Sequence, residues 1–285
     1  MEMKLWKLLM ILQKSTIGRF IASIAYNCGF VYIWHFFSYE RDRKHPTKEM
    51  LSSKEFFRQN KERVKRNLTL LCDAESKDVY KKIIRYRITH NWRDRPTYNK
   101  RDQYFPKEII NIRGGGIKFV DCGAYNGDTV RQFKKLTKNT YDKIVAFEPD
   151  HENCEILKKT DKNMIVIEAA VYSHDTELFF QTGDASMSKV SSSGVKVVAK
   201  AIDSTPECKD ATFIKMDIEG SEYDALIGAK NTIFANRPIL AICIYHSDED
   251  MIRLLELINS WNLGYRFFIR HHAQKTAETV LYAVQ

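Results

Sequence analysis

The segment FVDCGAYNGDT, residues 119–129, joins an apolar run to an amphipathic one and is the most informative part of the chain. Its glycines permit a tight turn and a close approach of the backbone to a ligand, and the Asp121 carboxylate could bind an ammonium or hydroxyl group. The spacing of Gly123 and Gly127 is G-x-x-x-G, which matches neither dinucleotide-binding proteins nor a P-loop. The segment is interpreted either as a strand that ends in a ligand-binding turn or as a simple Asp-Gly turn.

A second acidic residue ends the next apolar run, in VAFEPD, residues 145–150. Glu148 lies about 20 residues beyond the glycines, the spacing at which an acid accepts the hydroxyl groups of a ribose in α/β folds. Asp150 is placed to cap the following helix. Together, the glycines and Glu148 favour a cofactor that contains a nucleoside.

Short apolar runs alternate with amphipathic stretches from residue 117 onward. The pattern predicts strands at 117–120, 144–147, 165–167, 213–216 and 239–244, and helices at 129–136, 151–159, 222–229 and 248–261. This alternation indicates a parallel sheet with crossover helices, which binds ligands at the carboxyl ends of its strands. Residues 265–269 and 279–284 have no helix between them, so the last strand pair is expected to be antiparallel. An extra hairpin is expected from 178–180 and 195–199.

The composition excludes a fibrous or wholly disordered protein, because 44% of the 285 residues are hydrophobic and 28% are charged. The net charge of +9 favours anionic partners such as nucleic acid, acidic sugars or a membrane surface, although a protein that is simply basic fits equally well. The six cysteines show no C-x-x-C pair and no His at zinc spacing, so neither a zinc site nor a disulfide framework is indicated.

The chain is expected to divide at residues 48 and 106. Residues 1–48 are interpreted as an apolar and basic helical segment with a linker, 49–106 as a helical leader and connector, and 107–285 as the α/β domain. Polar residues interrupt 17–37, which favours packing on the core, on a partner chain or on a membrane surface over a membrane span. No signal peptide is evident, so we expect a cytoplasmic protein, with peripheral contact to the inner membrane face through 1–37 left open.

Four segments together resemble the FkbM-type S-adenosylmethionine-dependent methyltransferases. They are residues 119–129, FEPD (147–150), KMDIEGSE (215–222) and ETVLYAV (278–284). The resemblance covers about residues 105–285. Less firmly, residues 73–76, 86–87 and 103–106 are similar to the helical leader of some members. The resemblance implies a Rossmann-like α/β fold, with a seven-stranded methyltransferase sheet whose final strand pair is reversed, preceded by an N-terminal helical region.

The resemblance also implies S-adenosylmethionine as the cofactor. The loop after the first strand would line its methionine part, Glu148 would hold the ribose, and residues 169–171 would touch the adenine. The implied cofactor-binding residues are Asp121, Gly123, Ala124, Tyr125, Asn126, Gly127, Asp128, Glu148, Pro149, Ala170 and Asp217.

Three candidate catalytic residues follow the fourth and fifth predicted strands. Methyl transfer requires an acceptor oxygen aligned with the methyl group and a base that removes the hydroxyl proton. His246 is our first candidate for the base, oriented by Asp217 or Glu219. The other interpretation makes His246 a loop residue beside a helix cap at Ser247 or Asp248. The family link also suggests that Asp217 and Glu219 bind a divalent cation such as Mg²⁺ instead.

The candidate substrate residues are Lys215 and Tyr245, at the ends of the fourth and fifth predicted strands, and Arg270 and His271, at the end of the sixth. The run Arg270-His271-His272 could bind an anionic or sugar substrate, or it could be a solvated basic loop. The family more often has an aromatic residue where His272 stands, which puts a shared role for His272 in doubt.

The predicted function is O-methylation of a hydroxyl group on a sugar or glycan precursor. It rests on the resemblance and on the absence of the Asn-Pro-Pro-Tyr type of motif expected for amino methylation of bases. RNA methylation is an alternative suggested by the positive charge, but the basic residues are scattered and show no nucleic-acid module, so nucleic acid is an unlikely partner. A non-catalytic, membrane-associated protein that keeps the fold is the third possibility. A homo-oligomer is compatible with each of these three functions.

Overall fold

The computed structural model describes residues 45–99, 102–112, 115–161, 163–180, 190–191 and 195–285. The prediction of membrane contact through residues 1–37 lies outside this part of the chain. The chain divides into two compact units, residues 1–55 with 82–95 and residues 56–81 with 96–285. Among the described helices, none is long and apolar enough to span a membrane.

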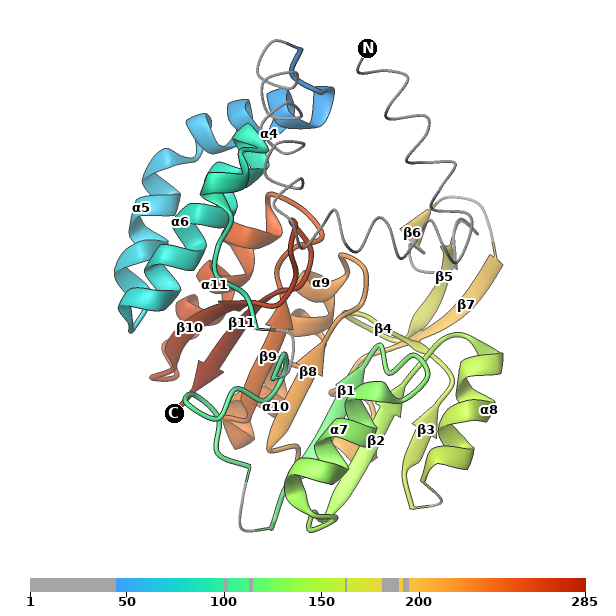
Figure 1. The fold of residues 1–285 in the computed structure, drawn as a ribbon. Coiled ribbons are helices and arrows are strands. Elements are labelled where there is room, and N and C mark those ends of the chain that lie inside the picture. Colours follow the sequence, from blue (N-terminus) through green and yellow to red (C-terminus); the bar gives the residue numbers. More distant parts are fainter. Residues whose placement is uncertain (1–44, 100–101, 113–114, 162, 181–189, 192–194) are drawn as a thin grey trace, which may run out of the picture. The chain divides into compact units, whose positions relative to one another are not determined.

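The second unit is built on a seven-stranded sheet (Figure 1). Its strands in chain order are β1 (Lys118–Cys122), β2 (Lys143–Phe147), β3 (Ile165–Ile167), β8 (Phe213–Met216), β9 (Ile239–Cys243), β10 (Arg266–His271) and β11 (Thr279–Val284). Their spatial order is β10-β11-β9-β8-β1-β2-β3. The five strands from β9 to β3 are parallel, and β11 runs antiparallel to both of its neighbours. The predicted α/β fold with a reversed final strand pair is therefore confirmed.

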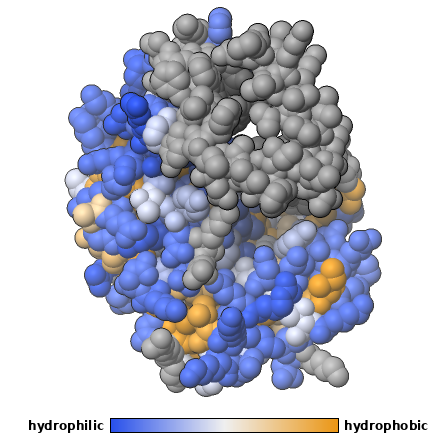
Figure 2. Space-filling view, viewed as in Figure 1, coloured by the Kyte–Doolittle hydropathy of each residue, from blue (hydrophilic) through white to orange (hydrophobic). Residues whose placement is uncertain are grey.

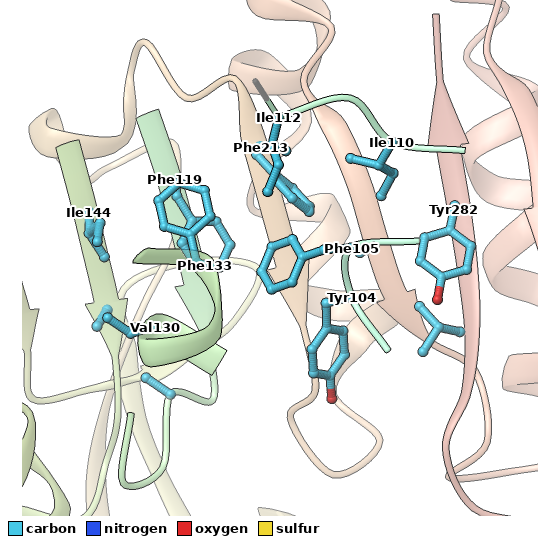
Figure 3. Close-up of a cluster of buried hydrophobic side chains, with 14 of the residues drawn as sticks. Tyr104, Phe105, Ile110, Ile112, Phe119, Val130, Phe133, Ile144, Phe213 and Tyr282 are labelled. Carbon is cyan, nitrogen blue, oxygen red and sulfur yellow. The ribbon is translucent and has the colours of Figure 1, made fainter. Parts of the chain in front are cut away.

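Aromatic side chains fill the core between the central strands and the elements that cover them (Figure 3). The rings of Phe119 on β1 and Phe133 stack with centroids 4.6 Å apart. The ring centroids of Phe105 and Phe213 are 5.4 Å apart, and Phe105 is 1% exposed. The sequence predicted a helical leader and connector at residues 49–106, and Phe105 anchors the end of this stretch in the core.

Helices connect the parallel strands as expected. They are α7 (Asp128–Thr137), α8 (His151–Thr160), α9 (Glu222–Ile227), α10 (Lys230–Asn236) and α11 (Asp250–Ser260). Asp150 caps α8, since its side chain accepts a hydrogen bond from the Asn153 amide at 2.9 Å. Ser247 caps α11 in the same way at 3.0 Å, so of the two candidate caps for this helix the structure uses Ser247. Helix α10 was not predicted.

Three longer helices come before the sheet: α4 (Lys48–Gln59), α5 (Lys61–Leu70) and α6 (Ala74–Thr89). A single residue, Asn60, separates α4 from α5. The Asn60 side chain donates to the Phe56 carbonyl oxygen at 3.0 Å, a local bond that competes with helix continuation. Asp73 caps α6 by accepting from the Ser76 amide at 2.7 Å. Residues 56–81 belong to the same compact unit as the sheet.

A second, four-stranded sheet has the order β4-β7-β5-β6. It consists of β4 (Ala170–Val171), β5 (Thr176–Phe180), β6 (Val190–Ser191) and β7 (Val195–Lys200). Strands β5 and β7 pair antiparallel, which confirms the predicted hairpin. Two short 3-10 helices, η1 (Trp92–Asp94) and η2 (Pro206–Cys208), complete the described elements. In Figure 2 the visible described surface is mostly hydrophilic, as expected when apolar side chains are gathered inside.

Candidate active site

The loop after β1 bends sharply over the carboxyl ends of the neighbouring strands. The amides of Gly123 and Ala124 donate to the Phe147 carbonyl oxygen at 3.1 and 3.0 Å, which attaches the loop to the end of β2. Gly123 has a φ of +77°, and a Cβ there would lie 2.0 Å from the Asp217 carbonyl oxygen. Only glycine fits this approach, so the predicted turn is a close crossing of the β1 and β8 chain ends.

Glu148 ties the end of β2 to the same loop. Its Oε2 accepts from the Tyr125 amide at 2.7 Å, and its Oε1 accepts from the Asp150 amide at 3.0 Å. Burial raises the pKa of Glu148, while these two amides act in the opposite direction. A carboxylate offers about four acceptor positions, so the two amides fix its orientation and leave acceptor positions for a ribose. Pro149 follows Glu148 directly, and Ala170 begins β4 shortly after the end of β3. Because β2 and β3 are parallel neighbours, both residues lie near the carboxyl ends of these strands.

Asp121 and Lys215 form a buried ion pair beneath the loop. They stand opposite one another on β1 and β8, with Lys215 Nζ 3.0 Å from Asp121 Oδ1. The Asp121 side chain is 0% exposed and that of Lys215 is 3% exposed. The Lys215 ammonium also donates to the Gly123 carbonyl oxygen at 2.7 Å. Burial raises the pKa of Asp121 to about 6, against the opposing effect of Lys215. These groups, predicted to contact cofactor and substrate, here hold one another and the backbone of the loop.

Asp217 lies at the end of β8 between two tyrosines. Its Oδ2 accepts from the Tyr104 hydroxyl at 2.7 Å and its Oδ1 from the Tyr245 hydroxyl at 3.1 Å. Burial would raise the pKa of Asp217, but the charges of Lys215 and His246 and the two hydroxyl groups outweigh it and lower the pKa. Asp217 is therefore held as a carboxylate at the mouth of the site.

His246 follows β9 and is surrounded by carboxylates. Its Nε2 lies 3.4 Å from Asp217 Oδ1 and 3.6 Å from Glu219 Oε2, and its Nδ1 lies 3.1 Å from Glu222 Oε1. Burial would lower the pKa of His246, but Glu222, Asp217 and Glu219 outweigh it and raise the pKa to about 9. The structure brings the three predicted catalytic residues together, and it adds Glu222, whose side chain is fully buried.

The described residues 97–99 and 102–105 lie along the ends of the last strands. The Asn99 amide donates to the His271 carbonyl oxygen at 3.0 Å, and the Gln103 side chain donates to Glu278 beside β11. Tyr104 then reaches Asp217 on β8. The sequence analysis gave Tyr104 no site role, because its only signal was membership of a short run similar to the family's leader.

Arg270 and His271 lie at the end of β10 and already have protein partners. The Arg270 guanidinium is 2.8 Å from Asp73 and 3.3 Å from Glu75, and His271 Nδ1 is 2.8 Å from the Thr279 hydroxyl. Because β10 is separated from β8 by β11 and β9, and strands lie about 4.8 Å apart, these residues are about 14 Å from the Asp217 end of the sheet. They border a small polar pocket that includes Tyr98, Asn99, Asp102 and Glu108.

Comparison with solved structures supports the fold. The "Methyltransferase FkbM from Methylobacillus flagellatus KT" is 24% identical with a TM-score of 0.69, over 81% of this chain and 60% of that chain. The chain thus spans about three fifths of the length of that relative. Fibrillarin of Aeropyrum pernix with bound S-adenosyl-L-methionine (12% identity, 60% of this chain, 67% of that chain, TM-score 0.39) is a more distant neighbour. A putative rRNA-methylase of Clostridium thermocellum is another distant neighbour, with 11% identity over 66% of this chain and 96% of that chain and a TM-score of 0.42.

The sequence comparisons identify the family. No curated protein matches the chain. The model of the methyltransferase FkbM domain matches residues 121–267, a range that begins at Asp121 and contains Glu148, the Asp217 cluster and most of the sheet. The chain therefore belongs to the FkbM methyltransferase family.

Proposed function

We propose that the protein transfers the methyl group of S-adenosylmethionine to a hydroxyl group of a sugar or glycan precursor. The observation that carries the proposal is the meeting of three features at one edge of the sheet: the glycine loop after β1, Glu148 after β2 and the Asp217 cluster after β8. In open α/β sheets ligands bind at this edge. We infer that the cofactor would lie across β1 and β2 with its reactive end toward Asp217.

The cofactor would lie along the loop from Gly123 to Gly127. Backbone groups of the loop would contact the methionine part, the free acceptor positions of Glu148 would bind the ribose hydroxyl groups, and Ala170 would border the adenine. The carboxylates of Asp217 and Glu219 favour the positive sulfonium group at the other end. Asn126 supports the loop from outside, because its carbonyl oxygen accepts from Arg131 at 2.8 Å.

In the proposed reaction, the acceptor oxygen attacks the methyl carbon as the carbon–sulfur bond breaks. The electron pair of that bond stays on the sulfur, which becomes a neutral thioether, and the hydroxyl proton passes to a base. His246 can accept that proton only in its neutral form, and its raised pKa makes this a minor form at neutral pH. Asp217 and Glu219 lie beside it and hold it in place.

A sugar acceptor is supported by the polar character of this edge. Tyr98, Asn99, Asp102 and Glu108 line a pocket at the end of β10, about 14 Å from the Asp217 end of the sheet. Its polar groups would bind a distal part of an extended, polyhydroxylated acceptor. The remaining support is the family resemblance. A divalent cation at Asp217 and Glu219 and a homo-oligomer stay predictions.

Glu148→Gln is expected to weaken binding of S-adenosylhomocysteine about ten- to hundredfold. The neutral amide cannot accept hydrogen bonds from both backbone amides and both ribose hydroxyl groups, and hydrogen bonds to a charged group contribute about 1.5–3 kcal/mol. Isothermal titration of the full chain measures the effect. Glu152→Gln, in the first turn of α8, is the matched control and should bind as the wild type does. Equal affinity in the Glu148 variant would remove the ribose assignment.

The acceptor class is tested by methyl transfer from labelled S-adenosylmethionine. We expect label in a pool of sugars and glycan precursors and none in RNA. Label in RNA, with binding that weakens steeply as salt rises, would favour the RNA alternative. Cofactor binding with no transfer to any hydroxyl acceptor would favour a non-catalytic protein that keeps the fold.

A further inference from the structure

We propose that Asp217, Glu222 and His246 form a site for one divalent transition-metal ion such as Mn²⁺ or Zn²⁺, with Glu219 able to join at the mouth. The three side chains come from different segments, after β8, at the start of α9 and after β9. One donor atom from each lies within 4.8 Å of the others. The binding of the ion stands on this geometry, and only its use in catalysis rests on the proposed function.

Three buried polar atoms of this cluster lack hydrogen bonds of normal geometry. These atoms are both ring nitrogens of His246 and Oε2 of Glu222. The side chain of His246 is 6% exposed and that of Glu222 is 0% exposed, so water has little access to them. Buried polar groups almost always have a partner. A metal ion bound among these atoms would supply the partner that they lack.

The distances around the imidazole suit metal ligands. Two ligands about 2.1 Å from a tetrahedral ion lie about 3.4 Å apart. Carboxylate oxygens of Asp217 and Glu219 lie 3.4 and 3.6 Å from Nε2 of His246, which is the spacing of ligands around one ion at Nε2. Glu222 Oε1 lies 3.1 Å from Nδ1, on the other side of the ring. A carboxylate beside the ring nitrogen that does not bind the ion would orient the ring, as in many metal sites. Glu219, whose side chain is 37% exposed, has room to rotate toward an ion.

The local charge favours a cation. Three carboxylates face His246, and Glu278, whose pKa is raised by burial and by Asp217, lies nearby. The ammonium group of Lys215, which acts on Asp217, is paired with Asp121. An imidazole ligand beside carboxylates suits Mn²⁺, Fe²⁺ or Zn²⁺ better than Mg²⁺, which prefers oxygen ligands alone. With the ion bound, His246 would act as a ligand and not as the base. The ion would assist proton loss instead, because it would polarise the acceptor hydroxyl group and lower its pKa.

The test is a titration of the metal-stripped full chain with Mn²⁺, followed by the electron paramagnetic resonance signal of the free ion. We expect one Mn²⁺ per chain, bound without cofactor, and little displacement by equimolar Mg²⁺. His246→Gln should weaken Mn²⁺ binding by about tenfold or more. His174→Gln changes an exposed histidine outside the cluster and should leave it unchanged. Asp217→Asn is the second variant if His246→Gln does not fold.

Two results would overturn the proposal. One is the absence of bound Mn²⁺ or Zn²⁺ in wild-type protein that still binds S-adenosylhomocysteine, which would leave the proposed function standing. The other is Mn²⁺ binding that both His246→Gln and Asp217→Asn leave unchanged, which would place the ion elsewhere. Loss of S-adenosylhomocysteine binding in a preparation that binds Mn²⁺ would instead count against the proposed function.

Discussion

Gly123→Ala is expected to lower the free energy of unfolding by about 3 kcal/mol or more, or to prevent folding. The glycine has a φ of +77°, and a Cβ at this position would lie 2.0 Å from the Asp217 carbonyl oxygen and 3.1 Å from its carbonyl carbon. The obstacle is backbone, which cannot rotate away as the end of a side chain can. Relief requires β1 and β8 to separate where they pair through Asp121 and Lys215.

Gly264→Ala provides the control for the backbone conformation. Gly264 has a φ of +79°, almost the same as Gly123, and a Cβ there would meet nothing within 4 Å. Its substitution should therefore cost only the conformational penalty of about 1–2 kcal/mol. Urea denaturation followed by circular dichroism measures both variants. If the two lose equal stability, the close crossing of chain ends at Gly123 does not constrain the fold.

Much of the sheet could be predicted because most of its strands are buried on both faces, although the edge strand β3 is only half-buried. Such strands appear as continuous apolar runs bounded by polar turns, and the predicted ranges 165–167, 213–216 and 279–284 coincide with β3, β8 and β11. The reversed final pair was predictable from the missing helix between the last two strands. Helix α10 was missed because it is short and follows α9 with only a brief turn between them.

The candidate site was less predictable, because it depends on contacts between distant segments. Tyr104 reaches Asp217 only because Phe105 beside it is anchored in the core, and no local pattern in a polar connector shows this. Arg270 could be read from the sequence as a substrate ligand. Its pairing with Asp73 depends on the packing of the α6 start against β10. Likewise, the register of β1 against β8 determines that Asp121 and Lys215 face each other.

Lys215→Met is expected to cost about 3–5 kcal/mol of unfolding free energy, because it leaves the Asp121 carboxylate buried without its partner. The Asp121 side chain is fully buried and that of Lys215 is 3% exposed, so water cannot replace the lost ammonium group. The variant also removes a hydrogen bond to the Gly123 carbonyl oxygen. Lys118→Met, at the other end of β1, breaks an exposed pair with Asp210 and should change stability little.

The double variant Lys215→Met with Asp121→Asn distinguishes two causes of the lost stability: burial of an unpaired charge and loss of packing. If the uncompensated carboxylate causes the loss, the neutral Asn should restore part of the stability, and Lys215→Met should cost less in the Asp121→Asn background than alone. The pH dependence gives a second signature. The folded-state pKa of Asp121 is raised to about 6, above the unfolded value of about 3.9. Its contribution to stability is therefore present below about pH 3.9 and is lost as the pH rises through 6.

Removal of Lys215 raises this pKa further, because the ammonium group opposes the effect of burial. The stability lost in Lys215→Met should then be smaller at about pH 5, where Asp121 can be protonated, than at about pH 8, where the folded state must bury the charge or take up a proton. The Asp121→Asn background should abolish this difference, because it has no carboxyl group to titrate. A loss that is the same at both pH values would show that the ammonium group acts through its hydrogen bonds to the loop after β1 and not through the charge of Asp121.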